Sequence, residues 1–398
     1  MGQYTKYILF CCVVLFLVNC SSLKKSYSTS HTTKAKSLQK PDMTYGEEED
    51  VYIPVAKSAR KTFFKDTDAE KYWVDSVYNQ MSLKERIGQL FMVAAYSNKD
   101  SVHFAAIDQL VKEDRVGGLI FFQGGPVRQA RLTNRFQKQA KVPLFIGIDA
   151  EWGLNMRLDS TYKYPWNMTL GAVKDMKLIE EVGQQMALEA KRIGCHFNFV
   201  PVLDINTNPK NPIIGHRSFG EEKHNVTDHA IAIMKGIQSQ GVFCTGKHFP
   251  GHGDTAADSH YALPQLNFDK SRLDKTELYP YKRMFDEGLV SVMVAHLNIP
   301  SLEHREGWPT SVSHNVVTNL LQEEMGFDGL IFTDALNMKG ASKFMAPGEL
   351  DLEAFLAGND ILLFAENVPL ATEKITNAIA SGLISEDRLA YSVKKILR

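Results

Sequence analysis

The sequence predicts a single TIM-type (β/α)8 barrel, preceded by an export signal and a tether. Short apolar runs alternate eight times with longer helical segments, which favours a parallel sheet covered on both faces. Several of these runs end in an ionisable residue, as expected for strands that open onto one catalytic mouth. A doubly wound open sheet is the alternative, because periodicity alone cannot close a barrel.

The composition excludes several classes of protein. Hydrophobic residues make up 44% and charged residues 23% of the 398 residues, which excludes wholesale disorder and a fibrous repeat. The formal net charge is −1, whereas a dedicated nucleic-acid binder normally shows a basic excess. We therefore expect no nucleic-acid partner.

Residues 1–20 are predicted to be an export signal. Lys6 precedes an apolar run at 8–18, which is shorter than the ~20 residues that span a bilayer and fits a signal peptide. Leu17, three places before Cys20, resembles the lipobox of bacterial lipoproteins, although Asn19 is unusual at its position. The resemblance implies an acylated Cys20 and a cell-envelope protein that touches the membrane through its lipid only. A plain signal peptide and an uncleaved anchor are the alternatives.

Residues 21–65 are predicted to be a flexible tether. The first half is rich in Ser, Thr and Lys, and an acidic stretch follows at 47–50. Such a segment cannot bury enough apolar surface to offset the entropy of ordering it. Beyond the signal only Cys195 and Cys244 remain, and we expect both to be buried free thiols.

The barrel elements follow from residue 66. Ser82 and Glu85 form a capping box at a helix start. Strands are expected where short apolar runs stand, at 89–95, 118–122, 144–149, 196–204, 242–248, 290–296, 329–334 and 361–364. Helices are expected between them, as at 175–193, 224–240, 270–287 and 313–325.

Five of the eight expected strands end in ionisable residues. These residues are Asp149, Asp204, the pair Lys247 and His248, His296, and Asp334. A single aspartate after a strand is usually a turn or cap residue. In a barrel, however, all the carboxyl ends of the strands meet at one mouth, so five together indicate a site there.

The segment 247–260 (KHFPGHGDTAADSH) is dense in ionisable residues. A zinc site is one interpretation, but the spacing of His and Asp matches no common ligand motif. Acid/base chemistry is another, because Asp258 could bond one nitrogen of His260, fix its tautomer and favour the protonated ring. A polar surface loop without function is the third.

This segment resembles the signature of glycoside hydrolase family 3, and of its bacterial β-N-acetylglucosaminidases in particular. Other resembling stretches occur in the family's order: MSLKERIGQLF (81–91), PLFIGIDAEWG (143–153), FVPVLDINTNP (199–209), GHRSFG (215–220), PTSVS (309–313) and GFDGLIFTDALNM (326–338). The resemblance covers about residues 70–398. Trp152 stands where the family often has a second glycine, and it could stack on a sugar or simply pack.

The resemblance implies a retaining mechanism. Asp334 would be the nucleophile that forms a covalent glycosyl intermediate, and His260 the acid/base oriented by Asp258. Substrate contacts would come from Asp149, Arg217, Lys247 and His248, with Arg157, Asp204 and His296 as weaker candidates. As structural alternatives, Arg217 could pair with Glu221, and Asp149 could cap a loop. No metal and no organic cofactor are implied.

The implied substrate is a glycan with terminal β-linked N-acetylglucosamine, and export points to peptidoglycan fragments. We expect a monomer. A family 3 β-glucosidase is the nearest alternative, but the element Asp258-Ser259-His260 argues against it. Outside the glycosidases, the sequence would also allow a metallohydrolase or a lipid-anchored glycan-binding protein. The glycan-binding protein would require a missing nucleophile or acid/base, and both residues are present. A further domain after Arg398 stays open.

Overall fold

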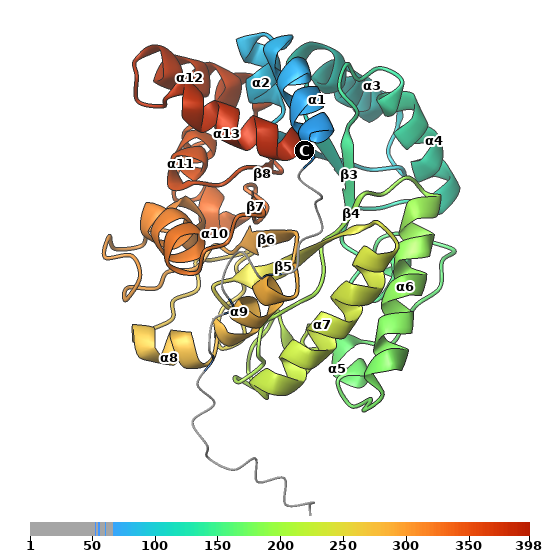
Figure 1. The fold of residues 1–398 in the computed structure, drawn as a ribbon, viewed down its shortest axis with the longest axis vertical. Coiled ribbons are helices and arrows are strands. Elements are labelled where there is room, and N and C mark those ends of the chain that lie inside the picture. Colours follow the sequence, from blue (N-terminus) through green and yellow to red (C-terminus); the bar gives the residue numbers. More distant parts are fainter. Residues whose placement is uncertain (1–51, 53–54, 56–59, 61–66) are drawn as a thin grey trace, which may run out of the picture. The chain divides into compact units, whose positions relative to one another are not determined.

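The computed structural model describes residues 52, 55, 60 and 67–398 (Figure 1). The predicted export signal, Cys20 and most of the predicted tether lie outside the described residues. Among the residues that are described, no helix is both long and apolar enough to cross a membrane.

Eight parallel strands form the centre of the fold, as predicted. Each strand pairs with its neighbour along the chain, and β8 pairs with β1. A parallel bridge between Phe332 and Ile361 then joins the β7 and β8 regions and completes the ring. The strands are β1 Phe91–Ala95, β2 Gly118–Phe121, β3 Phe145–Ile148, β4 Phe197–Asn198, β5 Phe243–Phe249, β6 Ser291–Val294, β7 Leu330–Thr333 and β8 Leu362–Leu363.

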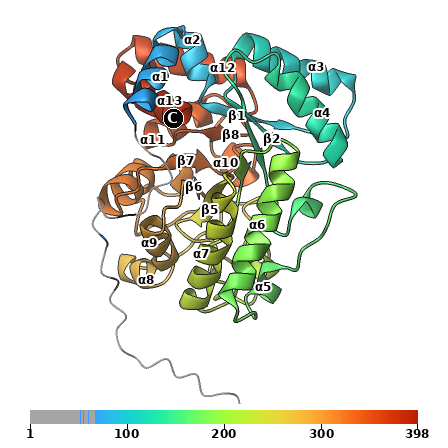
Figure 2. The same ribbon diagram turned by 45° about the vertical axis from the view of Figure 1, so that its right-hand side comes forward.

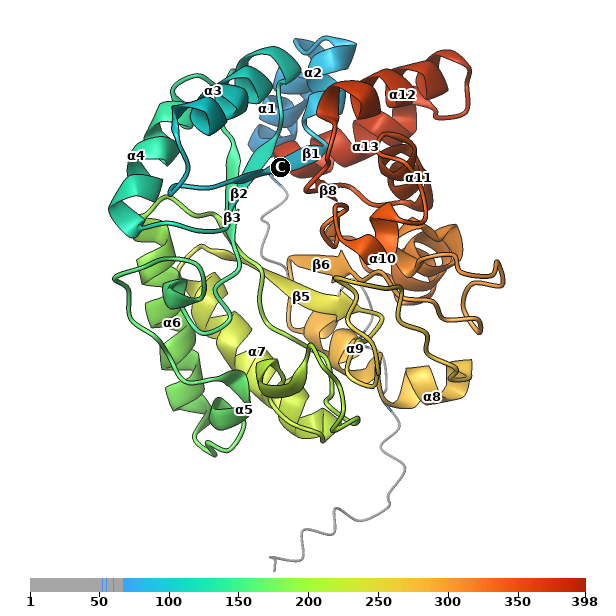
Figure 3. The same cartoon turned by 180° about the vertical axis from the view of Figure 1, so that it is seen from behind.

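Helices surround this ring, which Figure 2 shows from the side of α6 and α7 and Figure 3 from behind. The α-helices are α1 Asp68–Asn79, α2 Leu83–Gly88, α3 Ser101–Gln109, α4 Pro126–Gln137, α5 Asn167–Leu170, α6 Met176–Arg192, α7 Lys223–Ser239, α8 Lys270–Lys275, α9 Tyr279–Asp286, α10 Lys339–Ser342, α11 Glu349–Ala357, α12 Val368–Ala380 and α13 Glu386–Leu397. Short 3-10 turns are η3 Leu154–Met156, η4 Gly215–Arg217 and η5 Thr310–Val312, and π-helical turns are η2 Leu110–Asp114 and η6 Asn315–Glu324.

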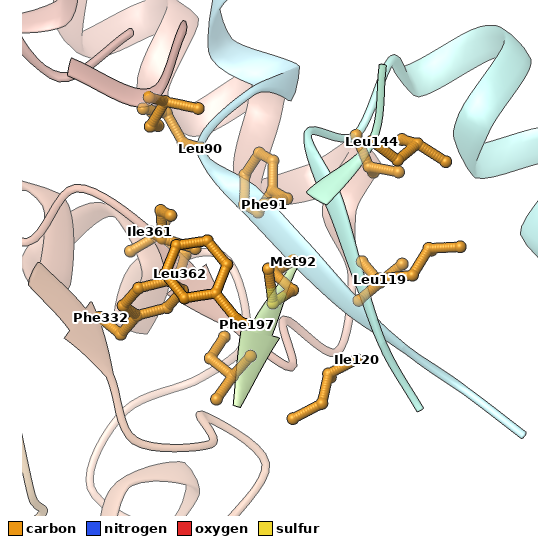
Figure 4. Close-up of a cluster of buried hydrophobic side chains, with 14 of the residues drawn as sticks. Leu90, Phe91, Met92, Leu119, Ile120, Leu144, Phe197, Phe332, Ile361 and Leu362 are labelled. Carbon is orange, nitrogen blue, oxygen red and sulfur yellow. The ribbon is translucent and has the colours of Figure 1, made fainter. Parts of the chain in front are cut away.

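Large apolar side chains fill the barrel. Phe332 of β7 meets Phe197 and Phe199 edge to face, each at a ring-centroid distance of 5.3 Å. Figure 4 shows Phe197 and Phe332 close to Met92, Leu362 and other core residues. All of these side chains are at most 2% exposed. The interior is therefore a packed core, and a substrate can bind only at the mouth.

Two expected elements are interrupted in the structure, and the helix expected at 313–325 is the π-helical η6. The helix expected at 270–287 is split into α8 and α9, because Pro280 has no N–H to continue a helix and stands in the first turn of α9 instead. The strand expected at 196–204 pairs regularly only at Phe197–Asn198, and Pro201 lacks the ladder donor. The capping box is confirmed: Glu85 accepts from the backbone N–H of Ser82 at 2.9 Å. Cys195 and Cys244 are buried free thiols, as expected.

Two residues of the predicted tether contact the barrel. The Tyr52 hydroxyl donates to Asp286 at 2.7 Å, and burial together with this bond raises the pKa of Tyr52. Arg60 also approaches Asp286, at 3.3 Å, and donates to the Gly326 carbonyl at 2.9 Å. Asp286 ends α9 and Gly326 precedes β7, so both contacts lie near the amino ends of the strands.

Candidate functional site

The carboxyl ends of the strands surround one cavity of about 230 Å³. Of the predicted site residues, Asp149, Arg217, Lys247, His248, His260 and Asp334 all line it. Asp258 reaches it through a hydrogen bond to His260, described below. Although these residues span the chain from the third strand to the seventh, the barrel brings them together.

A buried cluster of charged residues forms one side of the cavity. Lys247 lies 2.8 Å from Asp149 and 2.9 Å from Glu151, and its side chain is 2% exposed. Arg217 makes a bidentate pair with Glu151, at 2.7 and 2.9 Å. Arg157 adds a bond of 2.7 Å to Asp149. These five residues are called the charged cluster below.

Glu151 was not predicted as a site residue. It stands two positions after Asp149, and side chains two apart point to the same side of an extended chain. This spacing could have identified it. Glu151 also corrects the structural alternative for Arg217, because the bidentate partner of the guanidinium is Glu151 and not Glu221.

The charged cluster keeps its carboxylates ionised. Burial alone would raise the pKa of Asp149, but the cations of Lys247 and Arg157 outweigh it and lower that pKa to about 2. Burial is likewise outweighed at Glu151, where Arg217 and Lys247 hold the pKa far below its ordinary value. The cluster thus presents three cations and two carboxylates at neutral pH, which suits a ligand with many hydroxyl groups.

Asp334 follows β7 and is held by the sheet. Its backbone N–H donates to the Val294 carbonyl at 2.8 Å, and its carboxylate accepts the Ala335 N–H at 2.8 Å. Burial would raise the pKa of Asp334, but the neighbouring His248 and His296 rings lower it. The carboxylate therefore lines the cavity in its ionised form.

His248 is oriented by Asp204, which lies behind it. The two side chains are 2.7 Å apart, and Arg217 lies 3.3 Å from the other ring nitrogen. An arginine can only donate, so we assign the ring proton to the nitrogen that faces Asp204. Asp204 is 1% exposed and is not among the residues that line the cavity.

The weaker candidates Arg157 and His296 also differ in whether they line the cavity. Arg157 lines the cavity, whereas His296 does not. His296 bonds Ser311 at 2.7 Å and the Ala335 carbonyl at 3.1 Å, and burial lowers its pKa. It supports the backbone beside Asp334.

Asp258 and His260 form the predicted pair. The His260 ring nitrogen Nδ1 lies 2.7 Å from Asp258, whose carboxylate also accepts the His260 backbone N–H at 2.8 Å. Asp258 thereby fixes the ring so that Nε2 is the free nitrogen. The ring is 51% exposed, so it is open to a substrate and to water.

Unlike the exposed His260, His252 of segment 247–260 is buried, and burial lowers its pKa to about 4.

The interpretation of this segment as a zinc site finds no matching geometry. In the described part of the chain, no group of three or more His, Cys, Asp or Glu side chains is arranged to hold a metal ion.

Aromatic residues form the apolar wall of the cavity. Tyr96, Phe122 and Phe364 follow β1, β2 and β8, which are neighbours in the barrel. The rings of Tyr96 and Phe122 stack at 5.8 Å, and Phe364 meets Phe122 edge to face at 5.3 Å. Sequence reasoning missed this wall, because an aromatic residue at a strand end looks like a continuation of the strand.

Trp152 lies outside the residues that line the cavity. Its ring meets Trp166 at 4.3 Å and His216 at 6.2 Å. Of the two predicted roles, these contacts correspond to packing.

Known proteins resemble this chain over the same region. Residues 82–398 match the glycosyl hydrolase family 3 N terminal domain. The Beta-hexosaminidase A of Pseudoalteromonas piscicida is 30% identical over 328 residues, which are 73% of this chain and 54% of that protein. A Beta-hexosaminidase of Vibrio cholerae is 31% identical over 73% of this chain and 89% of its own length.

A solved structure of the same family also resembles this chain. The family 3 beta-N-acetylglucosaminidase of Paenibacillus sp. has 38% identity and a TM-score of 0.75, over 80% of this chain and 62% of that one. The chain thus spans little more than half the length of some relatives and most of the length of others. On the match over 82–398, the chain belongs to glycoside hydrolase family 3.

Proposed function

We propose that this protein is a retaining exo-glycosidase that removes terminal β-linked N-acetylglucosamine. One observation carries the proposal: the mouth of the barrel holds an ionised carboxylate, Asp334, and an exposed imidazole held by a carboxylate, His260 with Asp258. The relatives named as β-hexosaminidases and the β-N-acetylglucosaminidase structure support the choice of sugar.

The first step transfers the sugar to Asp334. The carboxylate attacks the anomeric carbon while the bond from that carbon to the leaving oxygen breaks, and Nε2 of His260 gives its proton to that oxygen. In the second step His260 takes a proton from water, and the hydroxide displaces Asp334 from the same carbon. Two inversions give net retention of configuration.

The charged cluster would bind the sugar. Asp149 and Lys247 are paired and largely buried, so their remaining lone pairs and N–H groups are already directed before a hydroxyl arrives. Arg217 and His248 extend the same set of polar groups toward Asp258 and His260, called the dyad below. Since none of these groups needs to become charged on binding, little free energy is lost in rearranging them around the sugar.

The test compares two substrates with the purified protein. An aryl β-N-acetylglucosaminide should be hydrolysed in strong preference to the matching aryl β-glucoside. The opposite preference would leave Asp334 in its role and move the enzyme to the β-glucosidases. Hydrolysis of neither substrate would contradict the proposal and favour a glycan-binding protein.

For the location, we propose a lipoprotein with domains 1–20 (signal), 21–65 (tether) and 66–398 (catalytic barrel). A monomer anchored through Cys20 in the cell envelope would meet peptidoglycan fragments. Mass spectrometry of the mature N-terminus should find an acylated Cys20, and Cys20→Ala should release the enzyme from the membrane fraction. An unmodified N-terminus elsewhere would contradict the anchor.

A further inference from the structure

Ser259 stands between Asp258 and His260, and it is the most buried of the three. Its side chain is 2% exposed, whereas the His260 side chain is 51% exposed. We propose that Ser259 is a positioning residue that sets His260 against Asp334, through one bond from its side chain and one to its carbonyl. The proposal rests on the function proposed above.

The side-chain bond joins Ser259 to His252. The Ser259 hydroxyl lies 3.0 Å from Nε2 of His252, and Thr255 lies 2.7 Å from Nδ1 of the same ring. The Thr255 hydroxyl already donates its proton to the His252 carbonyl, at 3.1 Å, so Thr255 accepts from the ring. In a neutral ring Nε2 is then the acceptor, and the Ser259 hydroxyl donates to it.

His252 is itself fixed to the barrel. Its backbone N–H donates to Asp204 at 2.7 Å, and Asp204 also holds His248. Asn211 donates to the His252 carbonyl at 2.8 Å. Through His252, the side chain of Ser259 is therefore tied to the same carboxylate that orients a cavity residue.

The main-chain bond joins Ser259 to the segment that follows the nucleophile. The Gly340 N–H donates to the Ser259 carbonyl at 3.1 Å. Gly340 lies in the first turn of α10, where N–H groups have no partner within the helix, so this bond satisfies a free donor. It connects residues 334–340, which begin with Asp334, directly to the dyad.

Gly340 is required for space. A Cβ there would lie 2.8 Å from the Ser259 carbonyl oxygen, 3.1 Å from that of Ala262 and 3.4 Å from Cβ of His296. Its backbone is not in the left-handed region, so an alanine would meet a steric obstacle and not a conformational one. Any larger residue would push the dyad away from Asp334.

These contacts explain how an exposed acid/base can be accurately placed. Little packing holds the His260 ring, so the position of its Nε2 depends on the backbone of 258–260 and on Asp258. A misplacement of about 1 Å can cost about 100-fold in rate. The loss would concentrate in the step that needs the acid.

The experiment uses Ser259→Ala and Gly340→Ala in the full chain, each with a matched control. Ser291→Ala removes another buried serine hydroxyl, bonded to Thr245 at 2.7 Å on the barrel strands. Gly183→Ala adds a Cβ 2.5 Å from the Ile233 carbonyl, between α6 and α7. Each variant is assayed with a nitrophenyl and an alkyl β-N-acetylglucosaminide, because only the alkyl leaving group needs full protonation.

For Ser259→Ala and Gly340→Ala we expect kcat/KM to fall about 10- to 100-fold with the alkyl substrate and less than about threefold with the nitrophenyl substrate. In the control variants, kcat/KM should change by the same factor with both substrates. Equal slowing of the two substrates by Ser259→Ala would overturn the proposal, even if Gly340→Ala fails to fold.

Hydrogen–deuterium exchange keeps this inference separate from the proposed function. Peptides covering 255–262 should exchange faster in Ser259→Ala than in the wild type and in Ser291→Ala. If the wild type prefers glucosides, the leaving-group series is repeated with glucosides. If it hydrolyses neither sugar, unchanged exchange in Ser259→Ala alone overturns the positioning role.

Discussion

Replacing Glu151 with glutamine should destabilise the barrel more than any change of a single surface charge. Glu151 is fully buried and accepts bonds from Arg217 and Lys247. A glutamine keeps the shape of the side chain but presents an N–H group to one of these cations. Because arginine and lysine can only donate, that contact would have no acceptor. The charged cluster would also change from two carboxylates against three cations to one against three.

The expected magnitude follows from this geometry. Breaking a buried ion pair by removing one partner costs about 3–5 kcal/mol. For the folded part, residues 67–398, the unfolding entropy is roughly 0.7 kcal/mol/K, from about 2.1 cal/mol/K per residue. The midpoint of thermal unfolding should therefore fall by about 4–7 °C.

The assay is thermal unfolding followed by circular dichroism, with Glu181→Gln as control. Glu181 is exposed on α6, so its substitution should change stability by about 0.5 kcal/mol or less. A fall in Glu151→Gln no larger than that of Glu181→Gln would refute the reasoning. It would mean that water or rearranged side chains neutralise the excess charge.

Four further predictions concern the site. Asp334→Asn should abolish turnover and leave the thermal midpoint unchanged; substantial remaining activity would exclude Asp334 as the nucleophile. His260→Ala should slow alkyl substrates far more than nitrophenyl substrates, and equal slowing of both would count against its role as acid. Asp149 has a folded pKa of about 2 and an unfolded pKa near 3.9, so its contribution to stability is complete above about pH 4 and is lost as the pH falls toward 2. Acid unfolding monitored by fluorescence should show this loss, and Asp149→Asn should reduce its slope. A strong chelator should leave turnover unchanged; inactivation that added zinc reverses would support the metallohydrolase instead.

The sequence alone predicted a parallel α/β fold of eight units and much of the site, whereas closure of the sheet into a barrel is seen only in the structure. Eight apolar runs separated by helical segments predicted the barrel, because burial on both faces leaves a local pattern in each strand. Asp149, Lys247, His248 and Asp334 were identifiable because they follow such runs directly. Asp258 and His260 were candidates because they lie two residues apart, and the family resemblance then implied their roles.

The partners of these residues were decided by the tertiary structure. Arg217 and Glu151 are separated by 66 residues, and only closure of the barrel brings the guanidinium to the carboxylate. The aromatic wall joins β8 to β1 and β2, so it requires the chain to return to its first strand. The bond between Gly340 and Ser259 joins the segment that follows β7 to the segment that follows β5, so it also requires the fold.

The physical reason is the range of the interactions. Hydrophobic periodicity and helix caps act between residues close in sequence, so they leave a pattern that can be recognised without a structure. Charge pairing, ring packing and the space left by a missing Cβ act between residues that only the fold makes neighbours. Most of the predicted catalytic residues could be recognised from local patterns. The groups that hold them in place become their neighbours only in the folded chain.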